Sequence, residues 1–278
     1  MNRIYRRGQG PALCEAVDRV VRTTPITDIH THLYAPPFGA LLLYGVDELL
    51  TYHYLIAEVV RATRMPYETY WAMSKRDRAD LIWRTLFIER SPIGEACRGV
   101  VTVLDRLGLD MASRKLDTYR GFFSGVDIDA HINRVFEAAN VRDVVMTNDP
   151  FDTLERPVWE EGYRGDERFH TALRIDPLLN DYANAGEKLR SWDYKAAKRA
   201  DASSLKEVRR FLSESLQRMN ALYMAVSLPP DFEYPDASLR SKLIGECVLP
   251  VAAEHNIPFA LMIGVKRAVN PALKLAGD

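Results

Sequence analysis

Two histidines separated by one residue, His30 and His32, carry the clearest chemical signal in the sequence. They follow the short extended run Pro25–Ile29 and precede a proline-rich loop at 36–39. Residues two apart on a strand point to the same face, so both imidazoles are expected to converge. Two imidazoles make half a site for Zn²⁺, or for a similar cation such as Mn²⁺. The alternative is a structural histidine pair at a strand end. A catalytic metal site would also need at least one further ligand and an open position for water or substrate.

An arginine stands at the end of a second apolar run, in the segment Leu173–Pro177. Burying the guanidinium of Arg174 without a partner would be costly. A carboxylate that accepts two parallel hydrogen bonds would offset that cost, and it could come from Asp176 or from an acidic substrate. The sequence does not choose between these two partners.

Two further segments contain candidate site residues that could equally have a purely structural role. His53 and Tyr54 fall on a predicted helix and could simply pack against a neighbouring sheet. Asn148 and Asp149 precede Pro150, a combination that also favours a plain turn at the end of a strand. The other three histidines are expected to be structural. They are His131 and His255 on predicted helices, and His170 at the start of a strand.

The elements that must position these residues alternate between extended and helical patterns. A helix is predicted over 11–23, a mainly helical stretch follows from about 45 to 109, and later helices cover 205–219 and 239–255. Asp47, Ser74 and either Asp127 or Asp129 are expected to cap helices. Five short apolar strands are predicted at residues 25–30, 141–147, 169–175, 221–228 and 258–265. Near-continuous apolar strands separated by helices predict a parallel sheet with covered faces, and a buried first strand.

Polar residues cluster after the predicted strand ends, as they do at the catalytic face of a β/α barrel. Lys266 and Arg267 follow the fifth strand in this way. We therefore predict an α/β fold, a partial TIM-type (β/α)8 barrel. It would form one domain over 1–278, with a helical insertion after the first strand at about 40–125. A closed barrel needs eight strands, so the chain is expected to be a fragment; an open five-stranded sheet is the alternative.

Composition narrows the classes of protein. The 278 residues are 47% apolar and 27% charged, and the formal net charge of −1 gives no basic excess for binding nucleic acid. The first 22 residues have no signal-peptide apolar region, and no run of 18 apolar residues predicts a membrane span. Three scattered cysteines suit a reducing compartment, so a cytoplasmic protein is expected.

Taken in order, these motifs resemble the uronate isomerases (glucuronate isomerase) of the amidohydrolase superfamily. Ile26–Leu33 looks like the superfamily's first-strand signature, and His53-Tyr54 with Arg61 resembles a "GDHYKWRAMR" helix. Three later segments resemble the family's "CTTDDPxD", "FRPD" and "LHIGAxR" motifs; they are Val145–Asp152, Leu173–Pro177 and Leu261–Arg267. Met262 and Asn148 depart from the pattern, which commonly has His and Asp at these positions.

The resemblance implies an aldose–ketose isomerase of uronate catabolism, such as one that interconverts D-glucuronate and D-fructuronate. His30 and His32 would hold a divalent metal, Arg174 and Asp149 would bind the acidic sugar, and His53 and Tyr54 would serve catalysis. The family's further metal-binding Asp would lie beyond residue 278, and the general base is expected to be this Asp or a metal-bound water. A homo-oligomer is possible. Two alternatives stay open: a metal-dependent hydrolase of an acidic small molecule, or an inactive truncated relative.

Overall fold

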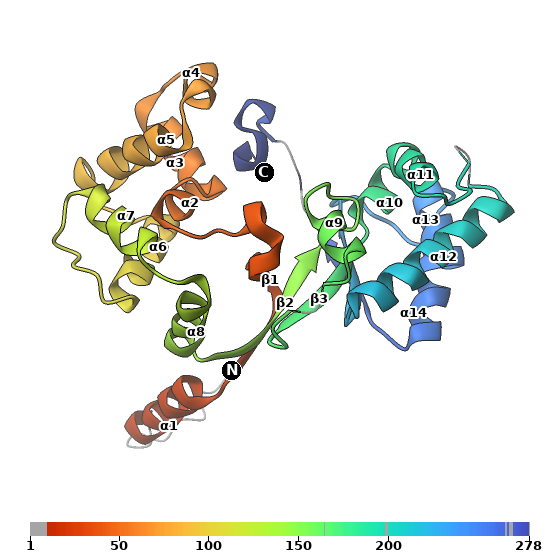
Figure 1. The fold of residues 1–278 in the computed structure, drawn as a ribbon, viewed down its shortest axis with the longest axis horizontal. Coiled ribbons are helices and arrows are strands. Elements are labelled where there is room, and N and C mark those ends of the chain that lie inside the picture. Colours follow the sequence, from red (N-terminus) through yellow and green to blue (C-terminus); the bar gives the residue numbers. More distant parts are fainter. Residues whose placement is uncertain (1–9, 164, 198–199, 265, 267–268, 278) are drawn as a thin grey trace.

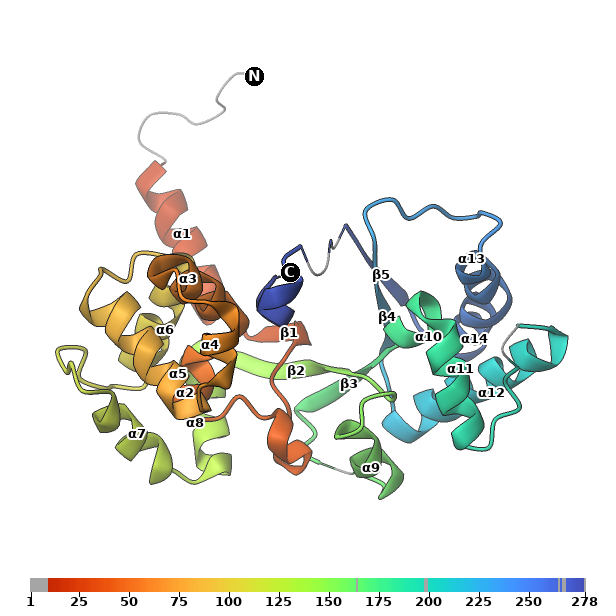
Figure 2. The same ribbon diagram turned by 90° about the horizontal axis from the view of Figure 1, so that it is seen from above.

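Five parallel strands form one sheet in the order β1-β2-β3-β4-β5, so each strand pairs with its neighbour in the sequence. In this computed structural model the described residues are 10–163, 165–197, 200–264, 266 and 269–277. Figures 1 and 2 show the strands curving into part of a cylinder, which agrees with the predicted partial TIM-type barrel. The strands are β1 (Ile26–Thr31), β2 (Val141–Asn148), β3 (Phe169–Arg174), β4 (Tyr223–Leu228) and β5 (Phe259–Ile263). Val265 and Arg267, which were predicted to end and follow the fifth strand, lie outside the described residues.

The expectation that the first strand is buried is wrong. Ile26 and Ile29 are 46% and 69% exposed, and Leu261 and Ile263 on β5 are also exposed. β1 and β5 are the two edges of the sheet, so each has a neighbouring strand on one side only. The central strands β2, β3 and β4 are mostly buried, as their apolar sequences predict.

Helices that alternate with the strands pack against the sheet and share one apolar core with it. Asp127 accepts a hydrogen bond from the Ala130 amide and caps α8, as predicted. Figure 1 places α9 to α14 together on one side of the sheet. These elements are α8 (Ile128–Ala139), α9 (Glu155–Glu160), α10 (Asp176–Asn180), α11 (Tyr182–Ser191), α12 (Ala202–Met219), α13 (Leu239–Leu243), the π-helical turn η3 (Ile244–Val248) and α14 (Leu249–His255).

The helical insertion between β1 and β2, here residues 46–124, has a second apolar core of its own. Tyr70 and Tyr119 are fully buried in it. The 3₁₀ helix η1 (Pro36–Leu41) precedes the insertion where a loop was expected. The helices of the insertion are α2 (Val46–Leu50), α3 (His53–Thr63), α4 (Tyr67–Ala72), α5 (Lys75–Ile82), the π-helical η2 (Trp83–Ile88), α6 (Glu95–Arg106) and α7 (Leu116–Ser124).

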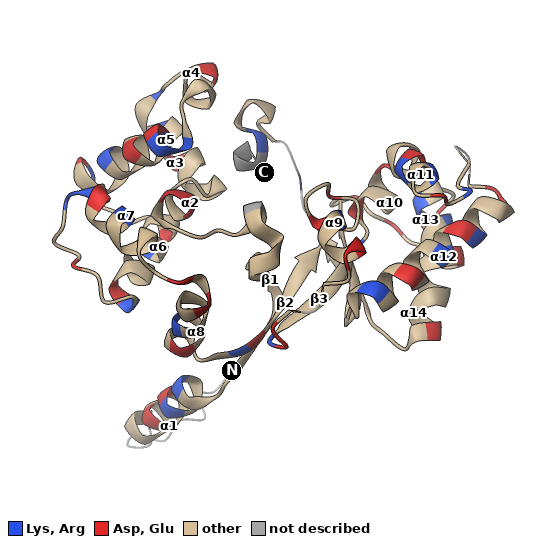
Figure 3. Cartoon of the chain, in the orientation of Figure 1, with Lys and Arg blue, Asp and Glu red and all other residues tan. Residues whose placement is uncertain are grey.

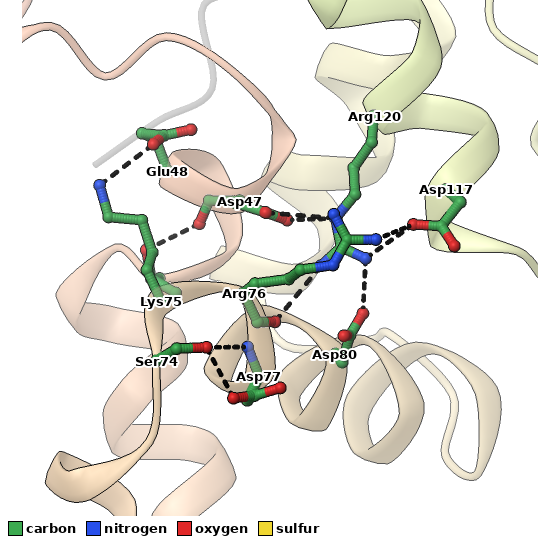
Figure 4. Close-up of polar contacts among 10 residues, drawn as sticks. Asp47, Glu48, Ser74, Lys75, Arg76, Asp77, Asp80, Asp117 and Arg120 are labelled. Atoms are coloured by element: carbon green, nitrogen blue, oxygen red, sulfur yellow. Dashed lines mark hydrogen bonds and ion pairs between the residues drawn. The ribbon is translucent and has the colours of Figure 1, made fainter.

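An ion-pair network joins three helices of the insertion (Figure 4). Arg120 on α7 contacts Asp47 on α2 at 2.9 Å, Asp80 on α5 at 2.8 Å and Asp117 at 2.9 Å. The prediction that Asp47 caps α2 is wrong. Gly45 occupies the cap position without a side-chain cap, and the Asp47 carboxylate pairs with Arg120 instead. Ser74 does cap α5, because its hydroxyl accepts a hydrogen bond from the Asp77 amide.

Both ends of the described chain lie away from the sheet core. α1 (Gly10–Thr23) has no buried residue and projects from the body of the molecule in Figure 2. The 3₁₀ segment η4 (Pro271–Gly277) packs on the insertion, where the Trp71 indole donates to the Ala272 carbonyl at 2.8 Å. Charged residues lie mainly on the helices, and most residues of β2 and β3 are uncharged (Figure 3). Among the described helices, none has the length and apolar character needed to cross a membrane.

Candidate active site at the strand ends

The two histidines of the first strand lie side by side, as their spacing predicts. His30 is in β1, and His32 comes directly after Thr31, the last residue of that strand. Their ring centroids are 5.6 Å apart with the ring planes at 90°. The phenol of Tyr223, on β4, donates to the Ile29 carbonyl at 2.5 Å and so holds the backbone just before His30. We refer to His30 and His32 as the histidine pair.

Charge and burial favour the neutral form of the histidine pair. Burial lowers the pKa of His30 and of His32, and the Arg174 guanidinium lowers both further. His30 and His53 add to the lowering at His32, while Asp28 opposes it at both rings. Neutral imidazoles are the form that binds a divalent metal, so the donor chemistry fits Zn²⁺.

The histidine pair alone does not make up a complete set of metal ligands. Over the residues that the structure describes, no three His, Cys, Asp or Glu side chains come together as a ligand set. The assignment of His30 and His32 as metal ligands therefore stays a prediction, since a closed structural site would need two further ligands.

Arg174 makes the internal ion pair that the sequence left open. Its Nε and Nη2 donate to the two carboxylate oxygens of Asp176 at 3.1 and 2.8 Å, and Nη2 also lies 3.1 Å from the Ser227 hydroxyl. Both side chains are largely buried, with 17% and 14% exposed. Nη1 has no hydrogen-bond partner among the described residues, so Arg174 keeps donor capacity for a second anion.

Asp149 lies at the end of β2, in the turn that the alternative explanation predicted. Its Oδ1 accepts a hydrogen bond from the Phe151 amide at 2.8 Å. Burial raises its pKa to about 6, although the Phe151 amide and the Arg174 guanidinium oppose the rise. Asp149 and the histidine pair therefore both lie within the electrostatic influence of Arg174.

Sequence reasoning missed a buried acid behind this turn. Glu155 is 2% exposed, and its Oε2 accepts from the Asn148 side-chain amide at 2.7 Å. Its Oε1 accepts from the Asp149 backbone amide at 3.1 Å and lies 3.2 Å from the Tyr34 hydroxyl. Burial raises the pKa of Glu155 to about 7. A glutamate at the start of a short helix carries no sequence signal for burial, because its partners depend on the tertiary fold.

His53 and Tyr54 begin α3, and their rings are in tilted contact, with centroids 4.1 Å apart and planes at 56°. His53 also lowers the pKa of His32, so the start of α3 in the insertion lies near the histidine pair. Tyr54 is 60% exposed and contacts His53 and Tyr52. The other histidines lie elsewhere: His131 packs against Tyr44 and Phe123, for example.

The chain matches no protein-family model and no curated protein sequence. It does match the crystal structure of a uronate isomerase from Bacillus halodurans, with 54% identity and a TM-score of 0.93. The predicted resemblance to the uronate isomerases is thereby confirmed. The match covers 99% of this chain and 65% of the Bacillus chain, so these residues span about two thirds of that protein's length.

Two more distant uronate isomerase structures share the fold. A glucuronate isomerase from Caulobacter crescentus is 14% identical with a TM-score of 0.64, and the match covers 97% of this chain and 64% of that chain. A uronate isomerase from Thermotoga maritima is 15% identical with a TM-score of 0.67, over 93% of this chain and 64% of that chain. At this level of identity the likeness concerns the fold alone.

Proposed function

We propose that the protein is an aldose–ketose isomerase acting on a hexuronate such as D-glucuronate. The observation that carries the proposal is the 54% identity to the Bacillus halodurans uronate isomerase over 99% of this chain. The charges of Arg174 and His53 both act on His32, so these groups lie near the histidine pair, and their residue types suit a cation and an acidic sugar.

The reaction moves hydrogen between two neighbouring carbons. A base removes the proton from C2 of the aldose, an enediol forms, and a proton returns to C1 as the carbonyl moves to C2. Oxidation at C2 balances reduction at C1, so no external oxidant is needed. The protein must hold the sugar in one orientation and stabilise charge that develops on the oxygens.

Each site residue has a role that its chemistry supports. His30 and His32 would hold a divalent cation, Zn²⁺ or a similar ion such as Mn²⁺. The bound cation would supply positive charge near the reacting oxygens. Arg174 would bind the substrate carboxylate through its remaining donors, and Asp149 would accept from a sugar hydroxyl. His53 and Tyr54 would donate to the hydroxyls or to the reacting carbonyl oxygen.

The binding partner, the oligomeric state and the cellular compartment are also proposals. The partner is a small acidic sugar, as the charge of Arg174 suggests, and self-association into a homo-oligomer is compatible with the sequence. The three scattered cysteines favour the cytoplasm.

The decisive experiment incubates the complete protein with D-glucuronate in ²H₂O and follows the sugar by NMR. We expect D-fructuronate to form, and solvent deuterium to enter the sugar at the exchanging carbon. An unchanged sugar, combined with cleavage of an amide or ester of an acidic compound by the same protein, would instead identify a hydrolase. Inertness toward both substrate types in metal-loaded protein would contradict any catalytic role.

A further inference from the structure

The buried carboxyl of Glu155 touches both sides of the candidate site. Tyr34 lies two residues after His32, in the segment that leaves β1, and its hydroxyl is within hydrogen-bond distance of Glu155 Oε1 and of the Thr147 carbonyl. The Asp149 amide and the Asn148 side chain, at the end of β2, donate to the same carboxyl. One side chain therefore contacts the segments that carry a candidate metal ligand and a candidate substrate ligand.

Packing around Glu155 leaves this carboxyl few other partners. The residue is 2% exposed and begins α9. α9 also packs against η1, because the rings of Trp159 and Phe38 lie 5.1 Å apart. A buried carboxyl is costly unless its oxygens accept hydrogen bonds. Here Tyr34, Asn148 and Asp149, from the two strand ends, lie within hydrogen-bond distance of the carboxyl, and the Trp159 indole of α9 also acts on it. The geometry thus makes the carboxyl and the two segments depend on each other.

The same contact favours an amide over a carboxylate at position 148. An aspartate at this position would place a second carboxylate against Glu155, with repulsion in a buried environment. The asparagine amide donates at 2.7 Å instead. Its own Oδ1 is buried and has no hydrogen-bond partner among the described residues, so the amide group can rotate to match a donor at position 155.

We propose that Glu155 is a positioning residue that holds the histidine pair and Asp149 in register through Tyr34 and the end of β2. This inference rests on the proposed function of the site. Glu155 would act through its contacts with Tyr34, Asn148 and Asp149, which fix the two backbone segments that carry the candidate ligands. Second-layer contacts of this kind set ligand orientation and metal affinity.

Three substitutions in the complete protein separate positioning from packing. Glu155→Leu keeps most of the volume but removes both acceptors. Glu155→Gln keeps one acceptor and offers a donor that rotated Asn148 can satisfy. Tyr34→Phe removes only the hydroxyl and is a mild second variant should Glu155→Leu fail to fold. Glu160→Gln, on the same helix but with a side chain 48% exposed, is the matched control.

Two measurements are made on each variant: hydrogen exchange at residues 33–35 and 149, and Zn²⁺ affinity by competition with a chelator. For Glu155→Leu and Tyr34→Phe we expect exchange about tenfold faster in both segments, as one lost hydrogen bond allows, and Zn²⁺ binding about tenfold weaker. Glu155→Gln should restore both values to within about twofold of wild type, and Glu160→Gln should change neither.

Wild-type Zn²⁺ affinity in both Glu155→Leu and Tyr34→Phe would overturn the inference, as would equal loss in Glu155→Gln and Glu155→Leu. Failure of the proposed function has a different signature. If His30→Ala/His32→Ala itself leaves Zn²⁺ affinity unchanged, the metal site is wrong, whereas the exchange rates still report whether Glu155 joins the two segments.

Discussion

Replacing Arg120 with methionine is expected to destabilise the protein by about 3 kcal/mol. The Arg120 side chain is 12% exposed and pairs with three carboxylates from three helices of the insertion (Figure 4). Burial lowers the pKa of Arg120, but the hydrogen bonds that its guanidinium donates to Asp117, Asp80 and Asp47 outweigh this effect and raise the pKa. The cation is therefore stabilised where it lies.

The magnitude follows from the exposure of each partner. Asp80 and Asp117 are 50% and 72% exposed, so after the substitution water can solvate both carboxylates and they add little to the loss. Asp47 is 21% exposed, and its two oxygens share one bifurcated hydrogen bond from Arg120 Nε, so it would be left largely buried without that partner. Breaking a buried pair on one side costs about 3–5 kcal/mol, and partial exposure of Asp47 favours the lower end.

Arg76→Met is the matched control from the same network. Arg76 also pairs with Asp117, at 2.6 Å, but its side chain is 60% exposed, so the expected loss is only about 0–1 kcal/mol. Urea unfolding followed by tryptophan fluorescence measures both variants, since Trp83 is buried in the insertion core. A loss for Arg120→Met no larger than that for Arg76→Met would refute the reasoning that burial gives this pair its strength.

Two further predictions concern the candidate site. Burial raises the pKa of Glu155 from 4.5 to about 7. Between these two pH values the folded state binds more protons than the unfolded state. The contribution of Glu155 to the free energy of unfolding therefore falls as pH rises through this window. Urea unfolding from pH 5 to pH 8 should show a loss on the order of 3 kcal/mol from this group, and Glu155→Gln should flatten the profile; equal slopes would contradict the assignment. Arg174→Lys should weaken binding of an acidic sugar about tenfold, because lysine cannot form the planar fork, as calorimetry can test; unchanged affinity would make Arg174 purely structural.

Local sequence patterns were enough to predict the sheet and several helix ends. The apolar runs before Asn148 and Arg174 became β2 and β3, and the predicted caps Ser74 and Asp127 are observed. These features depend on residues a few positions apart, which is why the sequence carries them. The histidine spacing likewise placed the two rings together.

Features that depend on distant residues could not be predicted in this way. Asp47 pairs with Arg120, 73 residues away, instead of capping its own helix. Glu155 meets Tyr34 across 121 residues, and neither residue type signals burial or a role in a site. The exposure of Ile29 depends on the place of β1 at the edge of the sheet, which the apolar character of its sequence does not report.

The most direct test of the proposed site is the Zn²⁺ content of the complete protein with and without the histidine pair. Purified wild type should retain about one Zn²⁺ per chain after dialysis. His30→Ala/His32→Ala should retain none, while His170→Ala, at the opposite end of β3, should match wild type. Equal zinc in all three proteins would contradict the assignment of His30 and His32 as metal ligands.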